Sequence, residues 1–430
     1  MKKRIVLTTF GSLGDLHPYI AIALGLQVRG YEAVIATSEN YRQKIEALGI
    51  GFRAVRPDHA KVDADPALLR RIMDLRKGPE CVIRELVMPV LRESYEDTLA
   101  AADGADLLVS HVLTFTTRLV SEKTGIPWAS TVLQPFCFLS VYDPPVLPNA
   151  VFLAKFRFLG PIFHRLLFGL SKWSIRSWVE PWHRLRAEIG LPPVRENPLV
   201  DGQHAPALVL ALFSKAFAGK QPDWPAQTVI SGIPFYDKDG DEGMSPELSN
   251  LLDSGPSPII FTLGSSAVRD AGQFYEHSAR AAEMLGRRAI LVVGKDTRNR
   301  PASLPDSVMA VDYAPFSELF PRAAAIVHQG GIGTTAQAMR SGRPMLVMPY
   351  AHDQPDNADR VVRLGIGRSI ARRRYNPARA AAELRQLLDN PSYGKRASEI
   401  GEQMRKEDGV ATACEALEGM LEKGRCAARR

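Results

Sequence analysis

A glycine-rich turn follows a short apolar stretch in the C-terminal third of the chain. Residues 325–328 (Ala-Ile-Val-His) predict a buried strand, and Gly-Gly-Ile-Gly at 330–333 leads from it into a predicted helix. Glycines at such a turn let backbone N–H groups approach an anion closely, and the helix N-terminus adds its partial positive charge. His328 and the hydroxyls of Thr334 and Thr335 supply further hydrogen-bond donors. The pattern favours a diphosphate-binding turn, although the glycines alone would also suit a plain strand-to-helix turn.

An acidic residue beside an amide follows the next predicted strand. The stretch 345–348 predicts this strand, and Asp353 and Gln354 come shortly after it. A carboxylate next to a carboxamide offers both acceptors and donors, which suits recognition of several sugar hydroxyls. Since the diphosphate turn and this pair lie one strand–helix–strand unit apart, the segment predicts a nucleotide-sugar site. The alternative is that both side chains lie in a solvated loop.

Apolar stretches alternate with helical patterns in both halves of the chain. Repeated strand–helix units favour parallel sheets covered by helices, and ligands on such sheets gather at the carboxyl ends of the strands. We therefore expect an α/β protein with two doubly wound, Rossmann-like domains that face each other across a cleft. A stretch rich in Asp, Gly, Ser and Pro at 236–258 predicts the linker between them. The predicted strands are 4–10, 32–37, 105–110, 127–131, 259–263, 289–293, 308–312, 325–328 and 345–348, and the first two predicted helices are 16–29 and 39–48.

Composition and charge exclude several classes of protein. Of 430 residues, 45% are hydrophobic and 23% charged, as in globular domains rather than disordered or repetitive chains. The net charge of +7 favours acidic ligands such as phosphates, but no long Lys/Arg tract predicts nucleic-acid binding. The four cysteines lie far apart without CxxC spacing, which argues against a zinc ribbon or a disulfide scaffold. No apolar stretch is long enough for a membrane span or a signal sequence, so we expect a cytoplasmic protein.

Residues 135–200 interrupt the alternation and are rich in aromatic residues and proline. Such a segment would line an apolar ligand cleft or rest on a membrane surface, and the basic residues among its aromatics would suit an anionic membrane. The plain alternative is that helices bury these rings in an ordinary core. We expect Phe136, Phe138 and Tyr142 to contact an apolar ligand, and transient contact with the inner membrane surface stays open.

Two linked motifs resemble those of a known family. His-x-Gly-Gly-x-Gly at 328–333 and His-Asp-Gln-x-Asp-Asn-Ala at 352–358 are similar to the donor-binding signature of the UDP-glycosyltransferase family with the GT-B fold. Gly-Ser-Leu-Gly-Asp-Leu-His-Pro at 11–18 extends the resemblance, which covers most of the chain and is weakest across 60–240. Within the family, the sequence looks most like bacterial sterol, antibiotic and flavonoid glycosyltransferases and the rhamnosyltransferase subunit of rhamnolipid synthesis.

The resemblance implies a donor-binding role at each matching position. Tyr313 stands where relatives place an aromatic residue that stacks on the base, and the loop 264–266 stands where their Ser and backbone N–H groups meet the phosphate. The donor-binding residues that it implies are Gly14, Gly264, Ser265, Ser266, Tyr313, Ala314, His328, Gln329, Gly331, Gly333, Thr334, Gln337, Asp353 and Gln354.

Two positions depart from the family's pattern. Gln337 stands where many relatives use Glu to hold the ribose, and an amide can still bond a hydroxyl but carries no charge. Gln329 follows His328 where some relatives have two histidines, so which of the two touches the diphosphate stays open.

Asp15 is the residue that we expect to act as general base. It follows Gly14 at the carboxyl end of the first predicted strand, and several bacterial relatives have Asp at this point. An acceptor hydroxyl that attacks the anomeric carbon must lose its proton, which a carboxylate within hydrogen-bond reach can take. Asp15 would otherwise only cap the following helix. His17 would assist it or serve as the base itself, and His111 lies near where relatives place a carboxylate partner.

The resemblance implies a two-domain hexosyltransferase that needs no cofactor. Residues 1–235 would bind the acceptor and 259–405 the UDP- or dTDP-sugar, and a helix within 406–430 would pack back on the N-terminal domain. The sugar would pass, with inversion, to a hydroxyl of a small hydrophobic acceptor such as a flavonoid or other polyphenol, a macrolide, a sterol or a hydroxy-acyl lipid. The sequence does not fix the sugar, the nucleotide, the acceptor or the oligomeric state.

Two Asp-x-Asp sequences spell a pattern that another transferase fold uses to bind a metal. They are Asp63-Ala64-Asp65 and Asp239-Gly240-Asp241, and both lie in polar stretches away from any predicted phosphate turn, so we interpret them as solvated turns. A helix dipole, His328 and neighbouring hydroxyls would stabilise a leaving diphosphate without a metal. We therefore expect no metal ion.

Other functions are compatible with parts of the pattern. A nucleotide-sugar 2-epimerase shares the donor chemistry in a related fold, and a lipid-directed rhamnosyltransferase is a variant of the main prediction. A Rossmann oxidoreductase is disfavoured because no GxGxxG follows the first strand. A non-catalytic nucleotide-sugar-binding accessory protein is disfavoured because Asp15, Asp353 and Gln354 are present.

Overall fold

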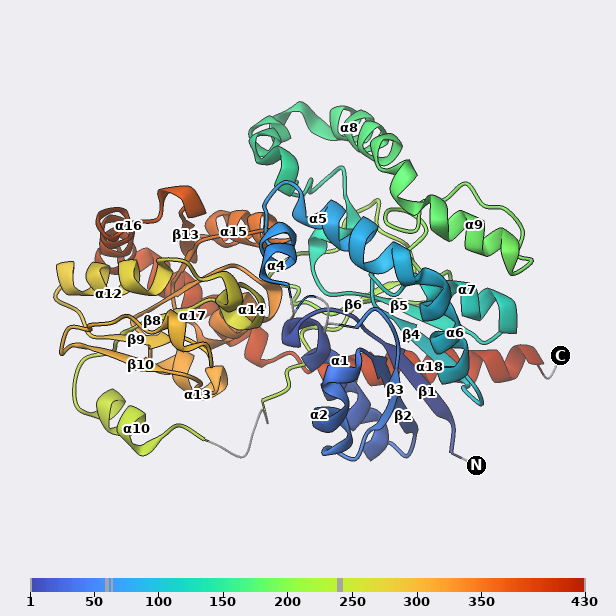
Figure 1. Cartoon of the computed structure of the whole chain (residues 1–430), viewed down its shortest axis with the longest axis horizontal. Helices are drawn as coiled ribbons and strands as arrows, with labels where there is room; N and C mark the ends of the chain where they lie inside the picture. The colour runs from blue at the N-terminus through green and yellow to red at the C-terminus, as the bar shows by residue number, and fades with distance from the viewer. Residues whose placement is uncertain (1, 59–61, 63–64, 238–242, 429–430) are drawn as a thin grey trace.

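The protein consists of two parallel β-sheets flanked by helices (Figure 1). The computed structural model describes residues 2–58, 62, 65–237 and 243–428. The first sheet has the strand order β3-β2-β1-β4-β5-β6-β7, and the second has the order β10-β9-β8-β11-β12-β13. All paired strands in both sheets run parallel. The predicted α/β architecture with two Rossmann-like sheets is confirmed.

The strands form where the sequence has short apolar stretches without alternation. β1 (Arg4–Thr8) lies between β2 (Glu32–Thr37) and β4 (Leu107–Ser110), and nearly all residues of the three strands are buried. Helices cover a parallel sheet on both faces, which explains why both sides of each strand are apolar. The remaining strands are β3 (Gly51–Ala54), β5 (Trp128–Val132), β6 (Val209–Ala211), β7 (Thr228–Ile230), β8 (Ile259–Thr262), β9 (Ala289–Val292), β10 (Val308–Val311), β11 (Ala325–His328), β12 (Met345–Val347) and β13 (Gly367–Ser369).

The helices flank the strands as the alternating pattern predicts. α1 begins at Leu13 rather than at the predicted Leu16, so Asp15 lies in its first turn. The helices of the first half are α1 (Leu13–Val28), α2 (Arg42–Glu46), α4 (Pro66–Ile72), α5 (Gly78–Cys81), α6 (Leu91–Ala101), α7 (Phe115–Thr124), α8 (Gly160–Ser174) and α9 (Glu180–Glu188). Those of the second half are α10 (Pro246–Asp253), α11 (Gly264–Ala267), α12 (Phe274–Met284), α13 (Phe316–Leu319), α14 (Ile332–Ser341), α15 (Gln354–Arg363), α16 (Pro377–Asp389), α17 (Pro391–Arg405) and α18 (Gly409–Ala428).

The last helix, α18, returns from the second sheet to the first (Figure 1). Its Ala413 and Leu417 are buried in one cluster with α1 and the first sheet. Gly25 of α1 permits this close approach, because a Cβ at that position would lie only 2.6 Å from Cγ1 of Val410. The packing of α18 therefore depends on a small residue in α1.

The segment predicted as a linker, 236–258, contains the helix α10. Ser245 caps this helix by accepting the N–H of Leu248 at 3.2 Å, and Leu248 and Leu252 are buried against the second sheet. The linker prediction missed the helix because the polar composition of the segment obscured a Ser-Pro helix start and a leucine pair four residues apart. The domain boundaries themselves stay predictions.

Of the two Asp-x-Asp sequences, only Asp65 lies within the described residues. Its carboxylate accepts the N–H of Ala67 at 2.8 Å and thereby caps α4. Asp63, Ala64 and the segment 239–241 lie outside the described residues. Over the described ranges, no three His, Cys, Asp or Glu side chains gather so that they could hold a metal ion.

The aromatic segment 135–200 divides between core and surface. Trp182 of α9 is fully buried, and its Nε1 donates to the carbonyl of Phe115 at 3.0 Å. In contrast, the 3₁₀ segment η5 (Pro148–Leu159) and the helix α8 leave many large apolar side chains exposed. The helix α8 lies at the top of the molecule in Figure 1. The ordinary-core interpretation therefore describes only part of this segment.

Candidate active site

The first turns of α1 and α14 meet between the two sheets. A Cβ on Gly333 of α14 would lie 3.4 Å from Cα of Gly14 of α1, so the two backbones approach each other closely. Each helix follows the carboxyl end of an inner strand, β1 or β11. The positive ends of both helix dipoles therefore point into one region. We call this region, between Gly14 and Gly333, the junction.

Asp15 places a carboxylate beside this junction. Its Oδ2 accepts the backbone N–H of Ser12 at 2.8 Å, and its Oδ1 lies 3.5 Å from Nε2 of His111. The Asp15 side chain is 29% exposed and that of His111 only 2%, so the accessible member of the pair is Asp15. Burial opposes ionisation of Asp15, but the hydrogen bond and charge of His111 and the bonds from Ser12 outweigh it and lower its pKa. The carboxylate is thus ionised at neutral pH, as a general base must be.

The ring of His111 is held in one orientation behind Asp15. Its Nδ1 accepts the N–H of Leu113 at 3.2 Å. In the neutral ring the hydrogen is therefore on Nε2, the atom that faces Asp15. A ring nitrogen that already carries hydrogen cannot take another proton, so within this pair the Asp15 carboxylate is the group with a free acceptor position. The helix cap that the sequence offers as the alternative role of Asp15 is present as well.

His17 lies apart from this pair. Residues two apart on an α-helix are separated by a rotation of roughly 200° about the helix axis. His17 and Asp15 therefore lie on different sides of α1. The His17 ring packs instead against Tyr236, with ring centroids 5.4 Å apart. The structure brings Asp15 and His111 together but not His17.

Replacing Gly11 with Ala is expected to lower kcat strongly through Asp15. Gly11 has a φ of +136°, which favours glycine, and a Cβ there would lie 2.3 Å from Oδ2 of Asp15. The methyl group would push the carboxylate out of place. Steady-state kinetics check this, with Gly30→Ala as the control, because Gly30 also has positive φ (+89°) but nothing within 4 Å of its Cβ position. Equal losses in the two variants would mean that backbone strain alone is responsible.

Polar groups converge on a glycine turn at the ends of β8 and β11. Gly264 has a φ of +60°, and a Cβ there would lie 2.4 Å from Nε2 of Gln329 and 2.9 Å from Oγ1 of Thr334. A Cβ on Gly331, the N-cap of α14, would lie 2.8 Å from the same Nε2. We call Gly264, Gln329, Gly331 and Thr334 the glycine cradle. Its donors lie beside the first N–H groups of α14, an arrangement that suits a diphosphate.

The structure distinguishes His328 from Gln329. His328 is fully buried, its Nδ1 accepts the N–H of Gly330 at 3.0 Å, and its Nε2 lies 3.4 Å from Sδ of Met345. Burial lowers the pKa of His328 to about 3, so the ring is neutral. The expectation that His328 donates to the diphosphate does not match this position, because both ring nitrogens face protein atoms. His328 thus supports the turn from its buried side, whereas the side chain of Gln329 is part of the glycine cradle.

Asp353 lies at the start of α15, within electrostatic reach of Asp15. Its Oδ2 accepts Nδ2 of Asn357 at 2.6 Å, and the same Nδ2 lies 2.9 Å from the carbonyl oxygen of Gly330. Burial raises the pKa of Asp353 to about 7, and the negative charge of Asp15 adds to the shift. Gln354 is turned inward, since its Oε1 accepts the N–H of Tyr350 at 2.8 Å.

Sequence reasoning missed Asn357 as a site residue. It stands four residues after Asp353, so both lie on one face of α15, and this spacing was the available signal. His352 was also missed: it has a φ of +58°, rare for a residue with a side chain, and immediately precedes Asp353. Burial lowers the pKa of His352.

Asparagine at position 353 is expected to make the ligand-free protein more stable at high pH. A carboxyl whose pKa is raised by folding binds more protons in the folded than in the unfolded state between 3.8 and about 7, so stability falls as pH rises through this window. Asp353→Asn should therefore raise Tm at about pH 8 and have less effect at about pH 5. Thermal unfolding across this range measures the difference, with the exposed Asp306→Asn as control. A pH-independent change in Tm would contradict the assignment.

An ionic network joins α15 to the N-terminal half. The fully buried Asp356 accepts the N–H of Val146 at 2.9 Å and Nε of Arg360 at 2.7 Å. Arg360 also pairs with Asp143 at 2.5 Å. These contacts fix the loop after the first aromatic residues against the helix that carries Asp353.

The other predicted donor residues lie at different depths. Ser265 is exposed and Ser266 half-buried in α11, Tyr313 is exposed beyond β10, and Ala314 is buried. The side-chain amide of Gln337 is hydrogen-bonded within the protein. Its Oε1 accepts Arg340 at 2.8 Å, and its Nε2 donates to Asp237 at 3.3 Å. The adjacent carboxylate of Asp237 explains this orientation.

The predicted acceptor residues differ in exposure. Phe138 is half-buried, stacks on Trp224 with ring centroids 4.0 Å apart and packs edge-on against the buried Phe213, so its predicted contact with an acceptor stays a prediction. Tyr142 is exposed, and Phe136 is half-buried. Cys137 between them lies within electrostatic reach of the active-site carboxylates, and burial raises the pKa of its thiol.

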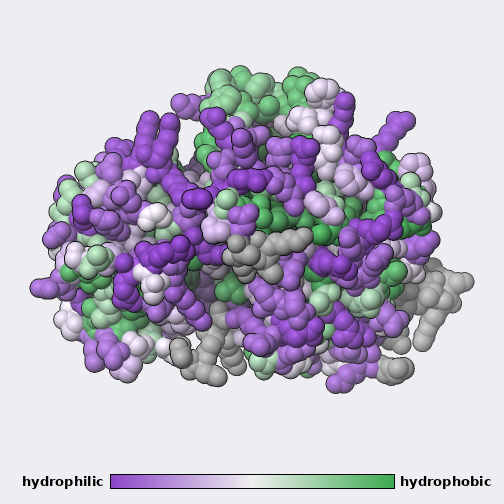
Figure 2. Space-filling model, viewed as in Figure 1, coloured by the Kyte–Doolittle hydropathy of each residue, from purple (hydrophilic) through white to green (hydrophobic). Residues whose placement is uncertain are grey.

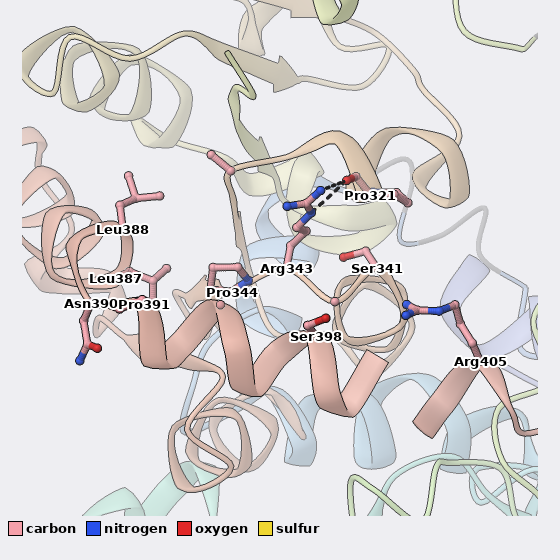
Figure 3. Close-up of a pocket in the computed structure, with 13 residues that line it drawn as sticks. Pro321, Ser341, Arg343, Pro344, Leu387, Leu388, Asn390, Pro391, Ser398 and Arg405 are labelled. Atoms are coloured by element: carbon pink, nitrogen blue, oxygen red, sulfur yellow. Dashed lines mark hydrogen bonds between the residues drawn. The ribbon is translucent and has the colours of Figure 1, made fainter. Parts of the chain in front are cut away.

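A separate pocket of about 490 Å³ lies at the C-terminal end of α14 (Figure 3). Its lining includes Ser341, Arg343 and Ser398, and Arg343 turns to donate to the carbonyl of Pro321 at 2.9 Å. None of the residues discussed above for the junction or the glycine cradle lines it. Among the described residues, no helix has the length and apolar character needed to cross a bilayer.

Comparison with known proteins places both halves of the chain beside glycosyltransferases. Residues 5–142 match the family described as glycosyltransferase family 28 N-terminal domain, and residues 280–418 match erythromycin biosynthesis protein CIII-like, C-terminal domain. The chain is 34% identical to O-mycaminosyltylonolide 6-deoxyallosyltransferase of Streptomyces fradiae over 97% of this chain and 98% of that protein.

Two further comparisons give lower identities. A sterol 3-beta-glucosyltransferase of Penicillium rubens is 29% identical over 99% of this chain, which spans only 31% of that longer protein. The crystal structure of glycosyltransferase VinC in complex with dTDP superposes with a TM-score of 0.69 at 21% identity, over 98% of this chain and all of that one. At this identity the likeness concerns the fold.

Proposed function

Because the chain belongs to the glycosyltransferase family with the GT-B fold and is a nucleotide-sugar glycosyltransferase, we propose that it transfers a deoxysugar from dTDP to a hydroxyl of a macrolide-like natural product, with inversion and without a metal. The observation that carries the proposal is the Asp15–His111 pair beside the glycine cradle, at the meeting point of two helix N-termini.

The comparisons support this choice of donor and acceptor. The Streptomyces fradiae relative is by name a deoxyallosyltransferase that acts on a glycosylated tylonolide, and VinC was solved with dTDP. The sterol glucosyltransferases share less identity and are longer than this chain. A dTDP-deoxysugar and a polyketide acceptor are therefore favoured over UDP-glucose with a flavonoid, a sterol or a hydroxy-acyl lipid.

The proposed reaction is one in-line displacement. The acceptor hydroxyl gives its proton to Asp15 while its oxygen forms a bond to the anomeric carbon. The bond between that carbon and the diphosphate oxygen breaks on the opposite side, which inverts the anomeric centre. The departing diphosphate gains negative charge, which the N–H groups at the start of α14, the Gln329 amide and the Thr334 hydroxyl would stabilise. The products are the glycoside and dTDP.

Asp353 would form hydrogen bonds with the hydroxyls of the sugar. The carboxyl lies beside the Gly330 turn through Asn357, so a sugar attached to a diphosphate in the cradle would come within its reach. With a pKa of about 7, the ligand-free group is partly protonated at neutral pH and can donate as well as accept a hydrogen bond.

A mass-spectrometric turnover screen tests the proposal. Purified protein is offered dTDP-rhamnose or UDP-glucose, each with a macrolide aglycone, a flavonol or a hydroxy-acyl lipid. We expect a product one deoxysugar heavier with dTDP-rhamnose and the macrolide. Isomerised donor without product would favour an epimerase, and an inert donor in all pairs would favour a binding-only protein.

Activity should persist in excess EDTA. The glycine cradle and the helix N-terminus supply the positive charge that a metal would otherwise bring to the leaving diphosphate. Turnover rates of the same preparation with EDTA and with added Mg²⁺ are compared. Loss of most turnover in EDTA, restored by Mg²⁺, would contradict the metal-free mechanism.

A further inference from the structure

The helix α8 presents a row of exposed apolar side chains. They recur every three or four residues and thus lie along one side of the helix. Figure 2 shows a hydrophobic cap at the top of the molecule, where Figure 1 places α8. We call this row, together with its extension in η5, the α8 face. Its main residues, between 62% and 79% exposed, are Phe158, Ile162, Leu166, Leu170 and Trp173.

The α8 face is part of a continuous apolar surface. Phe152 and Phe156 of η5 are exposed beside it, and between residues 149 and 178 only His164 is buried. His164 marks the inner side of the helix, with the ring of Phe163 5.3 Å from its own. Single exposed apolar residues are ordinary, but a continuous apolar row of this length indicates a surface that something else covers.

The charge of this segment indicates what covers it. From Pro148 to Val179 the sequence contains five basic residues and no acidic residue. Lys172 pairs with Asp201, and Arg157 pairs with Asp359 at 2.8 Å. Among the described residues, the other three make no ion pair; they are Lys155, Arg165 and Arg176.

We propose that the α8 face docks on an anionic lipid bilayer, with α8 lying in the plane of the interface. An apolar row bordered by unpaired basic residues fits acyl chains below and anionic headgroups beside them. Trp173 suits the headgroup level, and Arg176 lies over its ring with the guanidinium carbon 4.6 Å from the centroid. The uniformly basic charge disfavours a second copy of the chain, whose equal charges would face each other across the contact.

The geometry of α8 supports lying on the membrane rather than crossing it. Its 15 residues give a length of about 22 Å, short of the hydrocarbon thickness. Its ends are tied to the rest of the molecule through Arg157 on one side and Lys172 on the other. The docking concerns a surface outside the active site and does not depend on which sugar or acceptor the enzyme uses.

Vesicle co-sedimentation of the full chain tests the proposal. Vesicles of phosphatidylcholine alone are compared with vesicles that also contain phosphatidylglycerol. We expect binding to the anionic vesicles that weakens with salt, and little binding to the neutral ones. The double variant Ile162→Glu/Leu166→Glu should lose about tenfold or more in partitioning while it keeps its thermal unfolding, because both side chains are exposed.

Matched controls separate the α8 face from general surface effects. Val28→Glu and Met284→Glu add the same charge at exposed apolar residues elsewhere and should leave binding nearly unchanged. Trp emission should shift to the blue with anionic vesicles in the wild type and lose this shift in Trp173→Phe. The proposal is overturned if the wild type does not sediment with anionic vesicles, or if the double variant binds equally well. It is also overturned if the wild type is a dimer that the double variant dissociates, because a second copy would then cover the face.

Discussion

Asp15→Asn is expected to lower kcat by about 10²–10⁴-fold and to leave the KM for the nucleotide sugar nearly unchanged. The amide has the size of the carboxylate, and its oxygen can still accept the Ser12 N–H that starts α1, so the fold is retained. It cannot take the proton of the acceptor hydroxyl. We assign the donor contacts to the glycine cradle of the other sheet, which the substitution does not touch. Steady-state kinetics with a mass-spectrometric product assay measures both constants.

His17→Asn is the control for this result, because His17 lies two residues further on the same helix and contacts Tyr236 instead of His111. The pH profile gives a second test. Because the pKa of Asp15 is below its usual range, kcat of the wild type should stay flat from about pH 5 upward. An acidic limb near 6.5 together with a larger loss in His17→Asn would instead assign the base to His17.

Gly264→Ala is expected to raise the KM for the nucleotide sugar by about 10–100-fold with a smaller effect on kcat. A Cβ at this position would lie 2.4 Å from Nε2 of Gln329 and 2.9 Å from Oγ1 of Thr334. The methyl group would displace the donors that we assign to the diphosphate, and a hydrogen bond to a charged group contributes about 1.5–3 kcal/mol. Donor KM, and dTDP affinity by calorimetry, measure the effect.

Gly272→Ala separates this effect from backbone strain. Gly272 has a similar positive φ of +54°, but nothing lies within 4 Å of its Cβ position. It should cost stability without weakening dTDP binding. If both variants bind dTDP equally well, the glycine cradle does not hold the diphosphate.

Much of the fold could be predicted because each buried parallel strand corresponds to a short apolar stretch of the sequence. The strand at 325–328 agrees with β11 residue for residue, and that at 259–263 differs from β8 only at its end. The helix α10 was missed because its stabilisation comes from two leucines buried against the second sheet, and a polar local composition hides such long-range packing.

The candidate site could be predicted in its positions but not in its orientations. Spacing placed Asp15 and Asp353 at carboxyl ends of strands, where the structure finds them. Spacing could not decide between His328 and Gln329, because adjacent residues at a strand end point to opposite sides. The stacking of Phe138 on Trp224 could not be predicted either, because the two residues are far apart in sequence and only the fold brings their rings together.

The anomeric configuration of the product tests the central claim most directly. The claim is that one acceptor oxygen, deprotonated by Asp15, displaces the nucleoside diphosphate in a single step. The product of the turnover screen is purified, and its anomeric configuration is determined by NMR and compared with that of the donor sugar. We predict the opposite configuration. Retention of the donor configuration would require another route and would contradict Asp15 as the base of a single displacement.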